Sequence, residues 1–200
     1  ERKVMLKSFG AELIEVDAGD FDGAIALRDK LAKENNYFNF NQFHNPYNTE
    51  SHWFTTGMEV CKDIKFGVDI DAFVAGTGTG GTIMGAGKFI KNMHPNCKLV
   101  ALEPAESPVM SGGCPGLHGI QGIGDGSKFL VDLKDMDRIE TVSTQEAKDK
   151  AKVLAKEWGL FVGFSAAANY LVAERLIKEG YAQNVVTILC DRGERYFSCL

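Results

Sequence analysis

The sequence contains few cysteines, and their spacing fits neither a metal site nor a disulfide framework. The five cysteines are Cys61, Cys97, Cys114, Cys190 and Cys199. Their number is odd and no two of them form a CxxC pair, which indicates reduced thiols rather than a secreted disulfide scaffold or a zinc domain. We therefore predict a cytoplasmic protein without a metal site.

Long apolar runs and clusters of positive charge are also absent. The longest apolar runs, such as residues 185–190, fall far short of the roughly 20 residues that a membrane helix requires. Lysine and arginine are scattered along the chain, and the net charge is −5. We therefore expect neither a membrane span nor nucleic-acid binding. At 200 residues the chain is long enough to bury a sizeable core.

Glycine, by contrast, is abundant, and four glycines lie within the seven residues 76–82, Gly-Thr-Gly-Thr-Gly-Gly-Thr. An apolar run precedes this stretch and a segment of helical periodicity follows it. A strand, a glycine-rich turn and a helix in this order gather backbone N–H groups around an anion. The stretch lacks the lysine of a nucleoside triphosphatase loop and fits the dinucleotide fingerprint poorly. We predict a phosphate monoester site, and a glycine-rich turn without a ligand is the alternative.

Apolar periodicity predicts alternating helices and strands along the whole chain. The predicted helices are 2–9, 21–34, 50–63, 83–91, 144–158 and 166–179, and the predicted strands are 11–16, 37–40, 72–75, 98–103, 138–142 and 185–189. This alternation indicates an α/β fold around a largely parallel sheet, with ligands at the carboxyl ends of the strands. Residues 104–132 form a long, glycine-rich loop of the kind that is often functional. Ser143 or Thr144 is predicted to cap one helix and Ser165 another.

Eight motifs follow one another along the chain in the order found in one enzyme family. They are residues 1–13, 42–46 (Gln-Phe-His-Asn-Pro), 55–59 (Thr-Thr-Gly-Met-Glu), 78–82, 103–109, 118–124 (His-Gly-Ile-Gln-Gly-Ile-Gly), 162–165 and 193–196. Together they resemble the cysteine synthase (O-acetylserine sulfhydrylase) and cystathionine β-synthase family. Enzymes of that family have fold type II and depend on pyridoxal phosphate (PLP). The resemblance covers essentially the whole chain.

The resemblance implies positions for the cofactor and the substrate. The PLP phosphate would lie on the amides and hydroxyls of Gly78, Thr79, Gly80, Gly81 and Thr82. Ser165 would face the pyridine nitrogen, where a neutral hydroxyl favours chemistry at the β-carbon over transamination. Gln42 and the backbone of Gly122 would lie beside the substrate, which the resemblance implies to be a small amino acid, L-cysteine or O-acetylserine. Enzymes of this family are usually homodimers.

Two parts of the family pattern are missing. The Schiff-base lysine, in an S-x-K stretch, has no counterpart, since Lys88 and Lys91 belong to the helix after the phosphate loop. The T-S-G-N-T loop for the substrate carboxylate is missing as well. We therefore expect the chain to correspond to roughly the carboxyl-terminal two-thirds of a family member. Residues 1–42 would be the remainder of the N-terminal α/β subdomain, and residues 43–200 the C-terminal domain that binds the PLP phosphate.

Asp125 stands in a Gly-Asp-Gly sequence where many synthases have Gly-Ala-Gly. In this family a leaving group departs from the β-carbon to give an aminoacrylate, the elimination intermediate, which a nucleophile then attacks. Water or a protonated thiol benefits from a carboxylate as general base, whereas sulfide needs no help. If Asp125 is that base, the enzyme consumes L-cysteine, releases hydrogen sulfide and forms serine or lanthionine. A solvent-facing turn residue is the alternative.

Three other functions remain open. If Asp125 is only a turn residue, an ordinary O-acetylserine sulfhydrylase that makes L-cysteine is the better interpretation. The glycine loop alone also fits a dinucleotide-binding oxidoreductase, and the missing lysine fits a non-catalytic paralogue that acts as an interaction subunit. Cys190, at the end of the last strand, is expected to be a small buried residue rather than a nucleophile.

Overall fold

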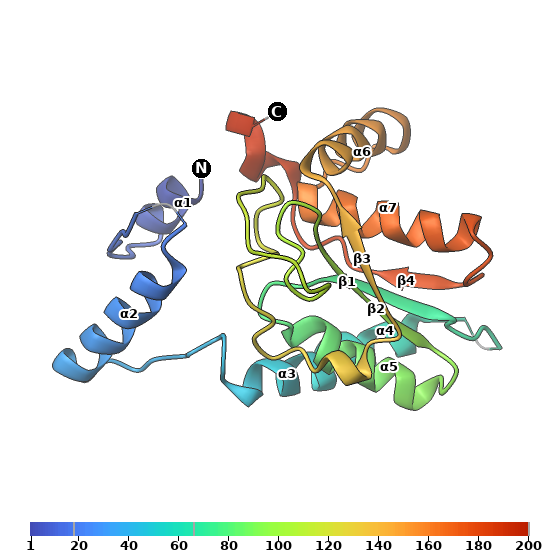
Figure 1. Cartoon of the computed structure of the whole chain (residues 1–200), viewed down its shortest axis with the longest axis horizontal. Helices are drawn as coiled ribbons and strands as arrows, with labels where there is room; N and C mark the ends of the chain where they lie inside the picture. Colours follow the sequence, from blue (N-terminus) through green and yellow to red (C-terminus); the bar gives the residue numbers. More distant parts are fainter. Residues whose placement is uncertain (18, 66, 200) are drawn as a thin grey trace.

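A parallel sheet forms the centre of the molecule (Figure 1). The computed structural model describes residues 1–17, 19–65 and 67–199, and within these residues the sheet has four strands in the order β3-β2-β1-β4. The strands are β1 (Ala72–Gly76), β2 (Lys98–Pro104), β3 (Arg138–Val142) and β4 (Val185–Thr187). All neighbouring pairs run parallel, which confirms the predicted α/β class and the four predicted strands from residue 72 onward.

Helices cover both faces of this sheet (Figure 1). They are α3 (Pro46–His52), α4 (Met58–Asp63), α5 (Lys88–Met93), α6 (Thr144–Trp158) and α7 (Phe164–Lys178). One-turn π-helical segments, Trp53–Gly57 and Ile83–Gly87, continue into α4 and α5. Two short 3-10 helices are Leu133–Asp135 and Gly193–Cys199. The four helices predicted from residue 50 onward are therefore confirmed, although the first of them begins earlier, at Pro46.

The two faces of the sheet carry two separate cores. Because successive strand residues point to opposite faces, Ala72 and Val74 of β1 lie in one core and Phe73 and Ala75 in the other. The first core is closed by α6 and α7, and the second by α4, α5 and the π-helical segment before α5. With both faces covered, β1 is fully apolar, as expected of a central parallel strand.

The first 42 residues lie beside this sheet rather than on it (Figure 1). Helices α1 (Arg2–Ser8) and α2 (Phe21–Asn35) confirm the two predicted helices, and neither contains a buried residue. The predicted strands 11–16 and 37–40 are wrong, because neither stretch is a strand in the described residues. An alternating pattern forms a strand only beside a hydrogen-bonded neighbour, and here Phe38 and Phe40 are 79% and 76% exposed. The division at residue 42 stays a prediction.

The two predicted helix caps differ in outcome. Ser143 caps α6 in a full capping box with Glu146, as predicted. The cap of α7 is Gly163, so the prediction that Ser165 is the N-cap is wrong. A Cβ on Gly163 would overlap the Asp191 carboxylate, so this tight position is taken by glycine and the helix begins one residue before Ser165. The serine therefore lies inside the first turn.

Residue 104 ends β2, and residues 105–132 of the predicted loop form no helix or strand, as their composition predicted. The first part of this loop is organised by Glu103, which is 2% exposed and is the last but one residue of β2. The carboxylate accepts hydrogen bonds from the backbone of Met110 (2.7 Å) and of Ser111 (2.8 Å), and from the Ser111 hydroxyl (2.6 Å). This buried carboxylate therefore fixes the course of the loop. Among the described residues no helix is long and apolar enough to span a membrane.

Candidate functional site

A cavity of about 440 Å³ lies where β1 and β4 end. All nine residues predicted for the cofactor, the substrate and the base line it: Gln42, Gly78, Thr79, Gly80, Gly81, Thr82, Gly122, Asp125 and Ser165. They come from loops and helices that are more than a hundred residues apart in the sequence. The structure thus gathers the predicted site residues, while their chemical roles stay predictions.

The glycine loop offers unpaired backbone donors to this cavity. Within the described part of the chain, the N–H groups of Gly78, Thr79 and Gly80 donate to no protein acceptor. The carbonyls on this loop are occupied instead, since Thr79 O accepts from Leu130 N at 3.0 Å. A Cβ on Gly78 would lie 2.6 Å from Gly122 O, so only glycine leaves the loop open there. Free amides at the start of a helix fit a phosphate group, and with the Thr79 and Thr82 hydroxyls they suit that of PLP.

Asn48 was not predicted from the sequence, yet it joins two parts of the site. Its Nδ2 group donates to Gln42 O at 2.8 Å and to Thr79 Oγ1 at 3.1 Å. A Cβ on Gly81 would overlap Asn48 Oδ1, so the side chain lies directly against the glycine loop. Asn48 therefore holds the Gln42 segment against the phosphate loop. It lies in α3, ahead of the helix predicted from residue 50, so no periodic signal in the sequence could have identified it.

Asn169 is a second residue that the sequence prediction missed. It is fully buried one helical turn after Ser165, and its Oδ1 accepts from Gly76 N at 2.7 Å. Its Nδ2 donates to Ile188 O at 2.8 Å and to Cys190 Sγ at 3.4 Å. Asn169 thus fixes the ends of β1 and β4, between which the cavity opens. A lone amide four residues after Ser165 in an alanine-rich helix is the signal that could have identified it.

Cys190 lines the cavity but differs from its predicted environment. The residue is exposed, so the prediction that it is buried is wrong. The reason is the cavity itself, which leaves space beside the end of the last strand. Desolvation of the sulfur still raises the pKa of the Cys190 thiol, against an opposing effect of the Ser165 hydroxyl. A thiol held protonated is a poor nucleophile, so the chemistry does not point to Cys190.

Arg2 closes one wall of the cavity with a cluster that the sequence analysis did not anticipate. Its guanidinium donates to Gln121 Oε1 at 2.5 Å and to the Tyr196 hydroxyl at 2.9 Å. The Tyr196 hydroxyl in turn donates to Asp191 Oδ2 at 2.7 Å. Burial, together with Asp191, raises the pKa of Tyr196 to about 12. The cluster therefore connects α1 to the loop that carries Gly122.

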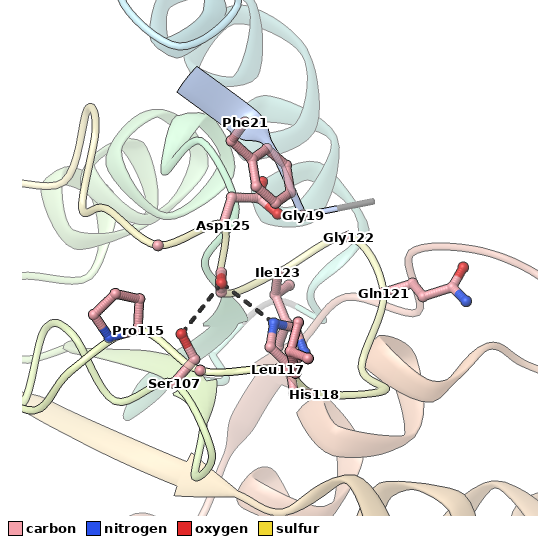
Figure 2. Close-up of a pocket in the computed structure, with 13 residues that line it drawn as sticks. Gly19, Phe21, Ser107, Pro115, Leu117, His118, Gln121, Gly122, Ile123 and Asp125 are labelled. Atoms are coloured by element: carbon pink, nitrogen blue, oxygen red, sulfur yellow. Dashed lines mark hydrogen bonds between the residues drawn. The ribbon is translucent and has the colours of Figure 1, made fainter. Parts of the chain in front are cut away.

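Asp125 lies at the junction of this cavity with a second one of about 730 Å³. Figure 2 shows the second cavity, with the Asp125 side chain directed toward Phe21 and Gly19. Burial raises the pKa of the Asp125 carboxyl, and His118 opposes part of this rise. Among the described residues no group forms a hydrogen bond or an ion pair with the carboxylate. Asp125 is thus a carboxylate of increased basicity that faces open space.

Comparison with known proteins identifies the family. A sequence model described as "Pyridoxal-phosphate dependent enzyme" matches residues 1–191. The chain belongs to this family. Cysteine synthase from Staphylococcus aureus (strain Mu50) is 42% identical over 203 residues, which cover 99% of this chain and 64% of that protein. The chain thus spans just under two thirds of the length of the curated relatives that it matches.

Solved structures of high similarity extend this comparison. The hydrogen sulfide-producing enzyme Fn1055 from Fusobacterium nucleatum matches with a TM-score of 0.92 and 40% identity, over 99% of this chain and 61% of that one. An aspartate-to-asparagine mutant of Fn1055, complexed with an α-aminoacrylate intermediate, matches with a TM-score of 0.93 and 39% identity, over 98% and 61%. O-ureido-L-serine synthase matches with a TM-score of 0.93 and 31% identity, over 100% and 64%.

These matches confirm the predicted family, the fold type II architecture and PLP as the cofactor of the family. The family match also argues against a dinucleotide-binding oxidoreductase, because the whole glycine loop lies inside the residues that the PLP-enzyme model matches. The free amides and hydroxyls of residues 78–82 are consistent with that cofactor.

Proposed function

We propose that the complete enzyme catalyses PLP-dependent β-replacement on L-cysteine, releases hydrogen sulfide and forms serine or lanthionine. The observation that carries this proposal is the position of Asp125. Its carboxylate lies beside the phosphate loop, faces an open cavity and has no partner among the described residues. A partly buried carboxylate that faces a cavity is the arrangement required of a general base, whereas a turn residue exposed to solvent has no use for it.

The predicted site residues that line the first cavity then have the following roles. The amides of residues 78–80 and the hydroxyls of Thr79 and Thr82 hold the PLP phosphate, and the Ser165 hydroxyl faces the pyridine nitrogen. Gln42 and the backbone of Gly122 orient the amino-acid substrate. When bound, PLP withdraws electrons from the α-carbon of the substrate, which allows the β-substituent to leave. The lysine that anchors PLP in this family has no counterpart among these residues.

Asp125 acts in the second half of the reaction. In the first half, the C–S bond of L-cysteine breaks and the sulfur leaves as hydrogen sulfide. In the second half, the oxygen of water or the sulfur of a second L-cysteine bonds to the same carbon, and the proton of this nucleophile passes to Asp125. The sums balance: L-cysteine and water give serine and hydrogen sulfide, and two molecules of L-cysteine give lanthionine and hydrogen sulfide.

Two structures of one relative support this proposal. Fn1055 is a hydrogen sulfide-producing enzyme, and the complex of its aspartate-to-asparagine mutant holds an α-aminoacrylate intermediate. If Asp125 is the base for the incoming nucleophile, an Asp125→Asn variant is expected to hold the elimination intermediate in the same way. The loss of the carboxylate would leave elimination intact and slow the capture of its product.

A second candidate function is O-acetylserine sulfhydrylase, which makes L-cysteine. It is favoured by the curated relatives of 42% identity, which are cysteine synthases. The two functions differ in their donor and in their need for a base, since sulfide is already a strong nucleophile at neutral pH. The decisive experiment compares the complete enzyme with L-cysteine alone and with O-acetylserine plus sulfide, and measures hydrogen sulfide, serine, lanthionine and L-cysteine. Faster turnover with O-acetylserine, without hydrogen sulfide release from L-cysteine, would overturn the proposal.

We also propose a cytoplasmic homodimer, by analogy with enzymes of this kind. A non-catalytic paralogue that serves as an interaction subunit is the remaining alternative. It predicts a natural protein without the cofactor lysine, so the intact mass and the violet absorbance of the natural protein distinguish the two. Sedimentation of that protein would test the dimer.

A further inference from the structure

Gly124, the residue that precedes Asp125, is held at both of its backbone polar groups. Gly124 N–H donates to Thr77 O at 2.9 Å, which ties it to the residue before the phosphate loop. The Gly124 carbonyl accepts from His118 Nε2 at 3.2 Å and from Ser107 Oγ at 3.5 Å (Figure 2). The histidine makes the shorter of the two contacts. The backbone that carries Asp125 is therefore fixed between β1 and the histidine.

Gly124 is tightly packed between its neighbours. Its φ is +71°, a conformation that favours glycine. A Cβ there would lie 2.6 Å from the Pro104 ring and 3.0 Å from His118 Nε2. The ring of His118 and the ring of Pro104 thus enclose the glycine, and a change in either one is transmitted to the next residue.

His118 is in turn supported by the start of α6. The next residue, Gly119, donates its N–H to Thr144 Oγ1 at 2.8 Å, and Thr144 N–H donates to Glu106 Oε1 at 2.8 Å. Ile120, two residues on, is fully buried in the core beneath α6 and α7. The histidine is therefore carried by a segment that is fixed on α6 and on the core.

The hydrogen bond to Gly124 also sets the tautomer of the imidazole. A ring that donates through Nε2 carries its proton there, which makes Nδ1 an acceptor. Among the described residues Nδ1 is buried and has no partner. Buried polar atoms without partners are uncommon and call for a reason. The reason here is that the ring is needed only for its Nε2–H donor, so its Nδ1 can remain without a partner.

We propose that His118 is the positioning residue for Asp125: its Nε2–H holds the Gly124 carbonyl and so sets the direction in which the Asp125 carboxylate meets the nucleophile. This inference rests on the proposed role of Asp125 as the base. His118 acts through the peptide of Gly124 and does not line the cavity that gathers the predicted cofactor and substrate residues. Its removal is therefore expected to affect the capture step and to leave elimination unchanged.

The test uses two replacements of His118 in the complete, PLP-loaded enzyme. Leucine removes the donor, whereas glutamine keeps an N–H at a similar reach, so His118→Leu and His118→Gln form a matched pair. Stopped-flow absorbance with L-cysteine measures the formation and the decay of the elimination intermediate. We expect His118→Leu to slow decay by up to about 100-fold, the cost of misplacing a reacting group by about 1 Å. Formation should be unchanged, and His118→Gln should restore most of the decay rate.

A double-mutant cycle with Asp125→Asn separates positioning from a general structural role. In the Asp125→Asn background, His118→Leu should have no further effect on decay. A further slowing there, equal slowing of formation and decay, or a folded glutamine variant without rescue would overturn the inference. If Asp125→Asn alone leaves decay unchanged, the proposed function fails. If it slows decay and His118→Leu does not, only the role of His118 fails.

Two further measurements keep the test independent of a single variant. If His118→Leu does not fold, His118→Asn, whose amide is too short to reach the carbonyl, replaces it with the same expected results. ¹⁵N resonances of the imidazole ring report the tautomer without any turnover. A ring protonated at Nε2 supports the inference, and a ring protonated at Nδ1 alone would overturn it.

Discussion

The Asp125 carboxylate lies against Gly78 of the phosphate loop: Oδ2 is 3.4 Å from the point that a Cβ on Gly78 would occupy. Gly122 O is closer still to that point, at 2.6 Å. The loop that carries the proposed base and the loop that binds the phosphate are therefore packed on each other. A change at one of them is expected to affect the other.

Gly78→Ala should reduce both cofactor affinity and capture of the nucleophile. The new Cβ would press on a backbone carbonyl, and overpacking of this kind costs about 1–3 kcal/mol. That cost corresponds to a loss of PLP affinity of about 5- to 150-fold, which titration of the violet absorbance measures. Asn92→Ala, at an exposed position in α5 that lines neither cavity, is the control. Equal affinities of the two variants would contradict this packing argument.

Asn169→Ala should destabilise the fold as well as the site. The replacement removes a fully buried amide, leaves Gly76 N–H without a partner and leaves Ile188 O with only the weak Cys190 thiol donor at 3.6 Å. Each buried polar group without a partner costs about 1–3 kcal/mol, so we expect a loss of about 2–4 kcal/mol in the free energy of unfolding. Denaturant unfolding measures it. Asn92→Ala, at an exposed position in α5, should change stability by less than about 0.5 kcal/mol.

Two serines at the starts of neighbouring helices should behave in opposite ways. Ser143→Ala removes a capping box and should cost about 1 kcal/mol of stability without effect on turnover. Ser165→Ala removes a hydroxyl that caps nothing but lines the cavity. It should leave the melting temperature almost unchanged while it alters the cofactor spectrum and slows turnover. A large loss of stability in Ser165→Ala would show that its role is structural.

The rate of the capture step should fall at a higher pH than it would with an aspartate of ordinary pKa. Burial raises the pKa of Asp125, with His118 opposing part of the rise, and only the deprotonated carboxylate accepts a proton. Capture should therefore slow as the pH falls through this raised pKa. Because a raised pKa in the folded state disfavours the charged carboxylate, Asp125→Asn should be at least as stable as the parent at neutral pH. Stopped-flow rates and unfolding curves across the acid range measure both effects.

The central part of the fold could be predicted from the sequence because its signals are local. The strand Ala72–Gly76, the glycine turn and the helix after it follow one another directly, and the capping box of Ser143 and Glu146 spans four residues. The strands predicted at 11–16 and 37–40 failed because a strand depends on a neighbour that periodicity does not reveal. The cap predicted at Ser165 failed because close packing on Asp191 reserves Gly163 for that position.

The predicted site residues were found through their motifs, whereas the residues that support them were not. Asn169 accepts a hydrogen bond from Gly76 across 93 residues of sequence, and Asn48 donates one to Thr79, 31 residues ahead. Such contacts arise only when the chain has folded, so the partners of these two side chains cannot be predicted from a local pattern. His118 was part of a quoted motif, but its contact with the Gly124 carbonyl became visible only in the structure.

The most direct measurement is stopped-flow absorbance of the Asp125→Asn variant with L-cysteine. Asparagine keeps the size of the side chain and removes its charge, so the loop should stay in place. We expect the elimination intermediate to form at a near-normal rate and to accumulate, because general-base assistance is worth about 100- to 10,000-fold. A thiolate supplied at high pH should restore its capture. If hydrogen sulfide release in steady turnover is unchanged, or if formation and capture slow alike, Asp125 is not the base.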